Sequence, residues 1–269
     1  MNNISILGCG WLGLPLAEHL VKKGYTVKGS VTSSHKLDIL EEKGIMPFLI
    51  RITDTEITGE QLSGFFASEI LVINFPPSRR EDILTYHSAQ ISLLIEAVKK
   101  SSIKHVVFIS STSVYPDLNR EVVETDDASV PSKGSGKALL SVEKLLREHF
   151  STTVIRFAGL IGYDRQPGRF LAGKKEVENG DAPINVIHQD DCIAIITAII
   201  EQQVWDETFN ACSDEHPQRK EFYTKAAEKI GLPLPEFKAG THTFKIINSA
   251  KLKQRLNYSF KYPNPIDTL

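Results

Sequence analysis

A glycine pattern near the N-terminus has the residue types and spacing of a phosphate-binding turn. The segment from Gly8 to Gly13 reads GxGxxG, directly follows a short apolar run at residues 4–7 and opens an amphipathic stretch that ends at Gly24. In such a turn the glycines let the backbone approach a pyrophosphate and let the helix pack on the strand, and the helix N-terminus attracts the anion. An ordinary tight turn is the alternative, but this context favours dinucleotide binding. The expected contacts are Gly8, Gly10, Trp11, Leu12 and Gly13.

The second apolar run indicates which dinucleotide binds. An acidic residue about 20 positions after the glycines would hold the ribose hydroxyls of NAD, yet no Asp or Glu lies between Glu18 and Asp38. The run instead continues into the hydroxyls and cations of residues 32–36, TSSHK, which suit a 2′-phosphate. This pattern favours NADP over NAD, with Thr32 and Ser33 as contacts. A serine that caps the next helix is the alternative, and the two roles are compatible.

A third group of residues with chemical potential is basic. Between residues 156 and 175 there is a single acid, Asp164, and the basic residues are Arg156, Arg165, Arg169, Lys174 and Lys175. Such an excess beside a dinucleotide site suits a phosphate or carboxylate ligand. We therefore expect Arg165 and Arg169 to bind a small anionic substrate. The alternatives are a solvated loop or an arginine paired with a core carboxylate, and we prefer the second of these for Arg156.

These residues must be positioned by alternating strands and helices. Short runs rich in Ile and Val alternate with amphipathic stretches, which predicts βαβ units and a parallel sheet. The expected strands are 4–7, 26–31, 46–50, 70–74, 105–110, 153–157 and 208–211, and the expected helices are 11–23, 34–43, 82–100, 136–149, 193–200 and 217–230. The predicted fold is a Rossmann-type, doubly wound α/β domain. Asn74, Phe75 and Pro76 then end a strand at the cofactor's edge of the sheet.

The predicted organisation is one core with a small addition. Residues 1–158 form the dinucleotide-binding core, and residues 159–269 form a small C-terminal substrate lobe that is interleaved with the last core elements at about 184–212. The chain has 269 residues, a net charge of −2 and 41% hydrophobic residues. This composition excludes disorder and gives no electrostatic reason to expect nucleic-acid binding.

Other sequence features narrow the setting of the protein. No apolar stretch approaches the roughly 20 residues that cross a bilayer, and no basic run marks the N-terminus, so we expect a cytoplasmic protein without membrane contact. Cys9, Cys192 and Cys212 form no CxxC pair, which favours buried thiols, and the histidines lack the spacing of metal ligands. His188 precedes a predicted helix, and a capping role is the favoured interpretation.

Several motifs together resemble a known family. They are GCGWLG, HVVFISSTSVYPD, VIRFAGLIG, NVIHQDDCIAII and TFNACSDEHPQRKEFY, spread over nearly the whole chain. They resemble the extended short-chain dehydrogenases/reductases of the NAD(P)-dependent epimerase/dehydratase group, and among these an atypical bacterial subgroup described as nucleoside-diphosphate-sugar epimerase-like. The resemblance implies an NAD(P)-dependent oxidoreductase or epimerase, an anionic, sugar-like substrate and a homodimer.

The catalytic residues depart from that family. Its chemistry uses a Ser or Thr at the end of the fifth strand, matched by Ser111, and a Tyr and a Lys four residues apart on the next helix. None of the seven tyrosines is followed four residues later by Lys, and Ser135 and Leu139 stand at those two positions.

Few other residues are available to replace the missing pair. Lys137 is the nearby ionisable candidate, although a solvated cation is its favoured interpretation, and Tyr115 or Tyr163 are the phenols that remain to contact substrate. Two function classes therefore stay open: an enzyme with a degenerate site, and an NAD(P)-binding sensor or scaffold without turnover.

Overall fold

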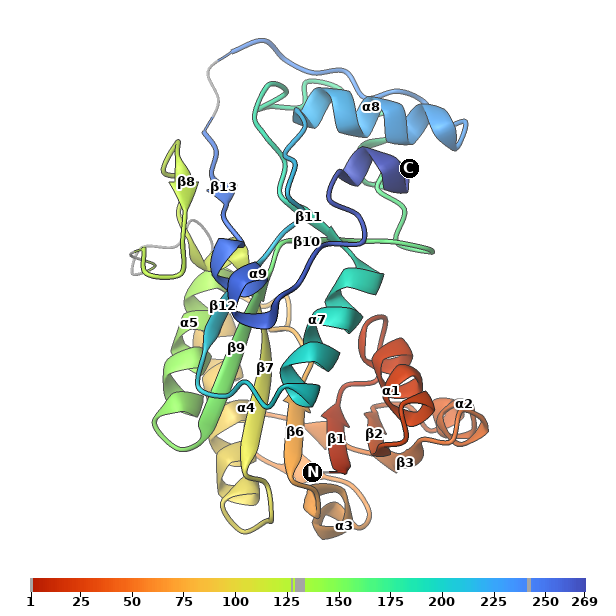
Figure 1. Cartoon of the computed structure of the whole chain (residues 1–269), viewed down its shortest axis with the longest axis vertical. Helices are drawn as coiled ribbons and strands as arrows, with labels where there is room; N and C mark the ends of the chain where they lie inside the picture. Colours follow the sequence, from red (N-terminus) through yellow and green to blue (C-terminus); the bar gives the residue numbers. More distant parts are fainter. Residues whose placement is uncertain (1, 127, 129–133, 241–242) are drawn as a thin grey trace.

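The core of the protein is a seven-stranded parallel sheet (Figure 1). The computed structural model describes residues 2–126, 128, 134–240 and 243–269. The strands, in their order across the sheet, are β3 (Met46–Leu49), β2 (Thr26–Val31), β1 (Asn3–Leu7), β6 (Ile70–Ile73), β7 (His105–Ser111), β9 (Ser151–Phe157) and β12 (Thr208–Ala211). The order reverses between β1 and β6, which is the point where doubly wound sheets bind ligands. The predicted Rossmann-type fold is confirmed.

Helices cover both faces of this sheet (Figure 1). They are α1 (Gly13–Lys22), α2 (Leu37–Glu42), α4 (Ile83–Val98), α5 (Gly134–Arg147) and α7 (Gln189–Glu201). Helix α1 packs against α7, and α4 packs against α5. Helix α4, which the sequence predicts at residues 82–100, buries the apolar side chains of Ile91, Leu94, Ile95 and Val98. Strands covered on both faces are continuously apolar, which is why these runs were recognisable.

The segment between β3 and β6 contains elements that the periodicity did not predict. A hairpin joins β4 (Arg51–Ile52) to β5 (Ile57–Thr58), and the short helix α3 (Leu62–Phe66) follows. Lys28, a buried residue of β2, donates its ammonium hydrogens to the carbonyls of Gly64 and Ala67 at the end of α3. Elements of two to five residues are too short to produce a periodic pattern, so only tertiary contacts define them.

A small lobe lies beyond the carboxyl ends of the strands, where Figure 1 shows α8 and the C-terminus. Its elements are β10 (Gly159–Ile161), α6 (Gly168–Leu171), β11 (Val186–His188), α8 (Arg219–Lys229) and the 3-10 turn η3 (Pro265–Thr268). A separate apolar cluster holds it together, formed by Ile161, Ile184, Val186 and Phe222. The lobe is therefore built from several separate segments, and the predicted domain boundaries stay a prediction.

The remaining elements join the lobe to the core. Strand β8 (Glu121–Val122) pairs with β13 (Ile246–Ile247), and α9 (Ala250–Leu256) packs on β12. All three cysteines are buried thiols, as expected. No helix in the described part of the chain combines the length and apolarity that a bilayer span requires.

Candidate functional site

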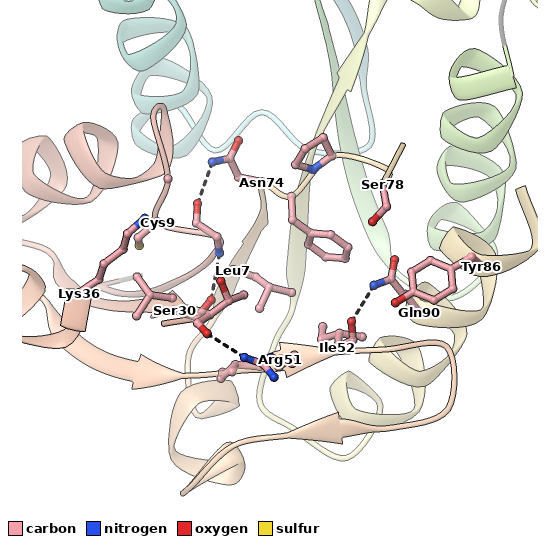
Figure 2. A pocket seen from close by; sticks show the side chains of 17 residues that line it. Leu7, Cys9, Ser30, Lys36, Arg51, Ile52, Asn74, Ser78, Tyr86 and Gln90 are labelled. Atoms are coloured by element: carbon pink, nitrogen blue, oxygen red, sulfur yellow. Dashed lines mark hydrogen bonds between the residues drawn. The ribbon is translucent and has the colours of Figure 1, made fainter. Parts of the chain in front are cut away.

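The glycine turn is shaped by close contacts between β1, β6 and α1. Gly8 has a φ of +105°, and a Cβ there would lie 2.7 Å from the carbonyl oxygen of Asn74. Its backbone amide donates to the hydroxyl of Ser30 at 3.0 Å, and its carbonyl accepts from the side-chain Nδ2 of Asn74 at 2.9 Å (Figure 2). A Cβ on Gly13 would lie 2.2 Å from the carbonyl oxygen of Gly8. Only glycine fits at these two positions.

Gly10 faces open space instead. A Cβ placed on it would meet no atom within 4 Å. This open side belongs to a cavity of about 390 Å³ that Gly8 and Gly10 line together with Asn74, Phe75 and Pro76 (Figure 2). The N-terminus of α1 begins beside it and carries no acidic residue in its first turn. Backbone amides and a helix dipole at a roomy, acid-free turn suit a pyrophosphate group.

The cavity also has basic lining residues. Thr32, Lys36 and Arg51 line it, and none of the described lining residues is Asp or Glu. A guanidinium nitrogen of Arg51 lies 3.4 Å from the carbonyl oxygen of Thr32. Sequence reasoning missed Arg51. No local signal marks it, because Arg51 reaches the cavity only through the pairing of β3 with β2, in which Val31 lies opposite Leu49.

The residues predicted to bind the cofactor fall into two groups. Those lining the cavity are Gly8, Gly10, Thr32, Asn74, Phe75 and Pro76. Leu12 and Gly13 are buried in the turn. Trp11 is partly buried, and its indole contacts the lobe. Ser33 is not among the described lining residues, and its hydroxyl makes no capping hydrogen bond, so neither interpretation of Ser33 gains a contact here.

The predicted catalytic serine lies at the expected edge of the sheet. Ser111 ends β7, is half-buried and accepts a hydrogen bond from the amide of Ser113 at 3.1 Å. The 3-10 turn η2 (Thr112–Val114) follows it and packs against α5. On α5, Ser135 is half-buried and Leu139 is buried. The place of the family's Tyr and Lys therefore holds a hydroxymethyl group and an apolar side chain.

Lys137 does not replace the missing pair in this structure. Its side chain is exposed, and it lies two residues after Ser135, roughly 200° around the helix. This placement matches the favoured interpretation of a solvated cation.

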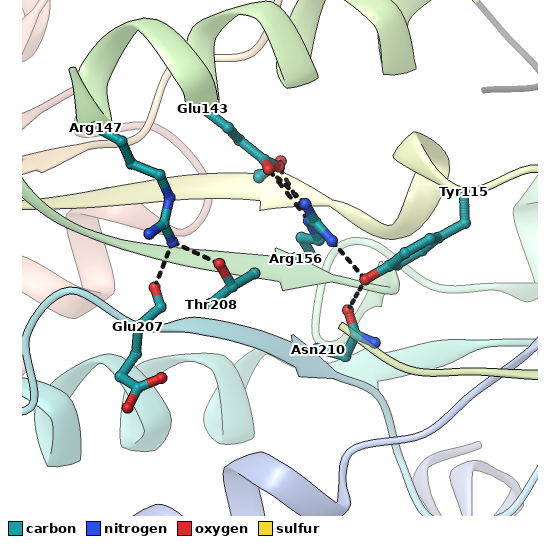
Figure 3. Close-up of polar contacts among 8 residues, drawn as sticks. Tyr115, Glu143, Arg147, Arg156, Glu207, Thr208 and Asn210 are labelled. Atoms are coloured by element: carbon teal, nitrogen blue, oxygen red, sulfur yellow. Dashed lines mark hydrogen bonds and ion pairs between the residues drawn. The ribbon is translucent and has the colours of Figure 1, made fainter. Parts of the chain in front are cut away.

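The substrate contact predicted for Tyr115 is wrong. Its side chain is fully buried, donates to Asn210 Oδ1 at 2.9 Å and accepts from Arg156 at 2.5 Å (Figure 3). Arg156 in turn pairs with Glu143 of α5 at 2.7 Å, which confirms the preferred pairing with a core carboxylate. Burial raises the pKa of Tyr115. This tyrosine belongs to a buried polar network that joins α5, β9 and β12.

The basic loop spreads its predicted residues over different partners. Tyr163 is 64% exposed with a φ of +34°. Its hydroxyl donates to Asp190 at 2.9 Å, and that hydrogen bond to a carboxylate raises the pKa of Tyr163. The guanidinium of Arg165 lies 5.6 Å from the ring centre of Trp11, whereas Arg169 donates to Gln166 at 3.2 Å. Neither Tyr115 nor Tyr163 has the lowered phenol pKa that proton exchange near neutral pH requires.

His188 is a helix cap, as favoured. Its Nδ1 accepts from the amide of Asp190 at 3.1 Å at the start of α7. Within the described ranges, no three His, Cys, Asp or Glu side chains gather as metal ligands would.

Comparisons with known proteins extend this picture. The family model of the NAD dependent epimerase/dehydratase family matches residues 4–212. Protein YeeZ of Escherichia coli K12 is 32% identical over 99% of this chain and 98% of its own length.

Two solved structures have similar folds. A conserved protein of unknown function from Silicibacter pomeroyi superposes with a TM-score of 0.79 at 21% identity, covering 100% of this chain and 96% of that one. UDP-glucuronic acid 4-epimerase from Bacillus cereus, solved with NAD, gives 0.80 at 18% identity, covering 99% and 96%. The glycine turn at the switch point and the match over most of the chain agree: this protein belongs to the NAD-dependent epimerase/dehydratase family.

Proposed function

We propose that this protein binds NADP across the carboxyl ends of β1, β2 and β6. The observation that carries the proposal is the cavity that opens beside Gly10 and is also lined by Lys36 and Arg51. The pyrophosphate would meet the backbone of the glycine turn, where a Cβ would otherwise project. The 2′-phosphate would lie near the two cations, where the second strand carries no acid to repel it. When bound, the cofactor supplies hydride acceptance or donation.

Calorimetric titration of NADP and NAD tests this proposal. We expect the wild type to bind NADP more tightly than NAD, and Arg51→Ala to weaken NADP by about tenfold, or about 1.4 kcal/mol, with little effect on NAD. Val31→Asp should shift preference toward NAD through ribose hydrogen bonds and repulsion of the 2′-phosphate. Arg255→Ala, an exposed arginine of α9, is the control. A wild-type preference for NAD of about tenfold or more would refute the 2′-phosphate site.

We propose further that the second ligand is small and anionic, with a nucleotide sugar as one class. The basic residues of the loop after β9, Arg165, Arg169, Lys174 and Lys175, support an anion in this region. Ser111 lies where it would orient a carbonyl or hydroxyl, but an isolated serine hydroxyl is a poor proton donor. We therefore expect hydride transfer to be slow or absent with common nucleotide sugars.

The second candidate function is a sensor that binds NAD(P) without turnover. Ser135 and Leu139 in place of the acid/base pair favour it, as do the raised pKa values of Tyr115 and Tyr163. A hydride-transfer assay on nucleotide sugars distinguishes the two. We expect no measurable rate of hydride transfer from the wild type. We expect any such rate to require the double substitution Ser135→Tyr and Leu139→Lys.

One outcome would favour the enzyme instead. Fast wild-type reduction or epimerisation of such a sugar, lost in Ser111→Ala or Lys137→Ala, would mean that the site uses a different acid.

The homodimer implied by family resemblance and the cytoplasmic location stay predictions.

A further inference from the structure

The glycine turn is held from outside by the loop that follows β10. The indole Nε1 of Trp11 donates to Asp164 Oδ1 at 2.7 Å, and the guanidinium of Arg165 lies 5.6 Å from the indole centre. Gln189, at the start of α7, donates to the backbone carbonyl of Trp11 at 2.6 Å. Trp11, in the middle of the glycine turn, therefore has three contacts from residues more than 150 positions later in the chain.

The guanidinium of Arg165 is not held in an ion pair. Arg165 is exposed and forms no ion pair with any residue that the structure describes. Its neighbour Asp164 is engaged by the indole, and the first turn of α1 contains no acid. A guanidinium and a helix N-terminus thus flank the same turn, and both favour an anion there.

We propose that Arg165 belongs to the dinucleotide site, where it binds the pyrophosphate from the lobe side, and that Asp164 acts as a positioning residue by orienting Trp11. This inference rests on the proposed dinucleotide binding and changes the role predicted for Arg165 from substrate to cofactor. It also makes the lobe loop part of the cofactor site.

Titrations with two ligands test the role of Arg165. NADP contains the pyrophosphate, whereas adenosine 2′-monophosphate keeps the adenosine and the 2′-phosphate but lacks both phosphates of that bridge. We expect Arg165→Ala to weaken NADP at least about tenfold while changing the affinity for the monophosphate much less. Arg255→Ala is the control, because Arg255 is an exposed arginine of α9 that has no part in either proposed ligand site. Its affinity for both ligands should equal that of the wild type.

A second pair of variants separates the acceptor of Asp164 from its charge. Asp164→Asn retains a carbonyl oxygen for the indole and removes a negative charge near the turn, so NADP should bind at least as tightly as to the wild type. Asp164→Ala removes the acceptor, so NADP should bind more weakly. The emission of Trp11 is read in a Trp205→Phe background, because Trp205, stacked on His105, is the only other tryptophan. That emission should shift in Asp164→Ala and not in Asp164→Asn.

The outcomes distinguish this inference from the function on which it rests. If the wild type binds neither NADP nor NAD, both fail. If the wild type binds NADP but Arg165→Ala behaves like Arg255→Ala, or weakens both ligands equally, the proposed role of Arg165 is wrong and dinucleotide binding stands. If Asp164→Asn weakens NADP as much as Asp164→Ala does, the positioning role of Asp164 is wrong.

Discussion

Two glycines of one motif have different roles in this protein. Gly13 is required by packing, because a Cβ there would collide with the carbonyl of Gly8 at 2.2 Å. Gly10 is free of such neighbours and faces the cavity. A substitution at Gly13 therefore disturbs the protein itself, whereas one at Gly10 disturbs only what the protein binds.

Gly10→Val should abolish dinucleotide binding and leave a folded protein. The isopropyl group would fill the space where the backbone meets the pyrophosphate, without touching the chain. Calorimetry measures the affinity, and thermal unfolding checks that the midpoint is retained. Gly13→Ala is the comparison, for which we expect a clearly lower unfolding midpoint because backbone must shift. An unchanged affinity in Gly10→Val would exclude this turn as the pyrophosphate site.

At the scale of elements, the start of α7 joins the core to the C-terminal segment. Asp191 is fully buried and accepts hydrogen bonds from the hydroxyl of Tyr258 at 2.6 Å and from the amides of Lys261 at 2.7 Å and Tyr262 at 3.2 Å. Its position in the first helical turn is also favourable for a negative charge. One carboxylate thus holds residues 258–262 onto the helix.

Asp191→Ala should release this segment. Each hydrogen bond to a charged group contributes about 1.5–3 kcal/mol, so we expect a large loss of unfolding free energy in urea and faster proteolysis near residues 258–262. Asp267→Ala is the control, since Asp267 is an exposed acid of η3, which follows this segment in the chain. If the two variants have equal stability, Asp191 does not anchor the segment.

At the scale of the whole molecule, the histidines make stability depend on pH. Burial lowers the pKa of His87 and His188 below the ordinary histidine value of 6.5, and the pKa values of His19, His105 and His216 shift the same way. His87, a residue of α4, is fully buried against the ring of Phe75, and its Nε2 has no hydrogen-bond partner among the described residues. These imidazole rings are neutral in the folded protein.

The unfolding free energy should therefore fall as the pH drops. A group with a lowered histidine pKa binds more protons when unfolded, so its stabilisation is present above the unfolded pKa of 6.5 and is lost progressively below it. Urea unfolding between about pH 7.5 and about pH 5.5 measures this. His87→Gln, which cannot titrate, should show a shallower decline. A stability that stays constant over this range would contradict the prediction.

The sequence alone determined what depends on neighbours along the chain. Apolar runs of four to seven residues and helical stripes specify buried strands and docked helices, and the glycine pattern specifies a turn, because these signals are local periodicities and conformational requirements. The absence of a Tyr and a Lys at Ser135 and Leu139 is likewise readable residue by residue. These features predicted the fold, the glycine turn and the incomplete catalytic site.

Only the tertiary structure decided how distant residues combine. Tyr115 reads as an available phenol in sequence, yet it bonds Asn210, 95 positions away, in the core. Arg165 reads as a substrate contact, yet its neighbour Asp164 bonds Trp11 across 153 positions. Arg51 reads as an ordinary loop cation until the pairing of β2 with β3 brings it beside Thr32. The crossovers of the sheet create these contacts, and no local pattern encodes which side chains meet at the strand ends.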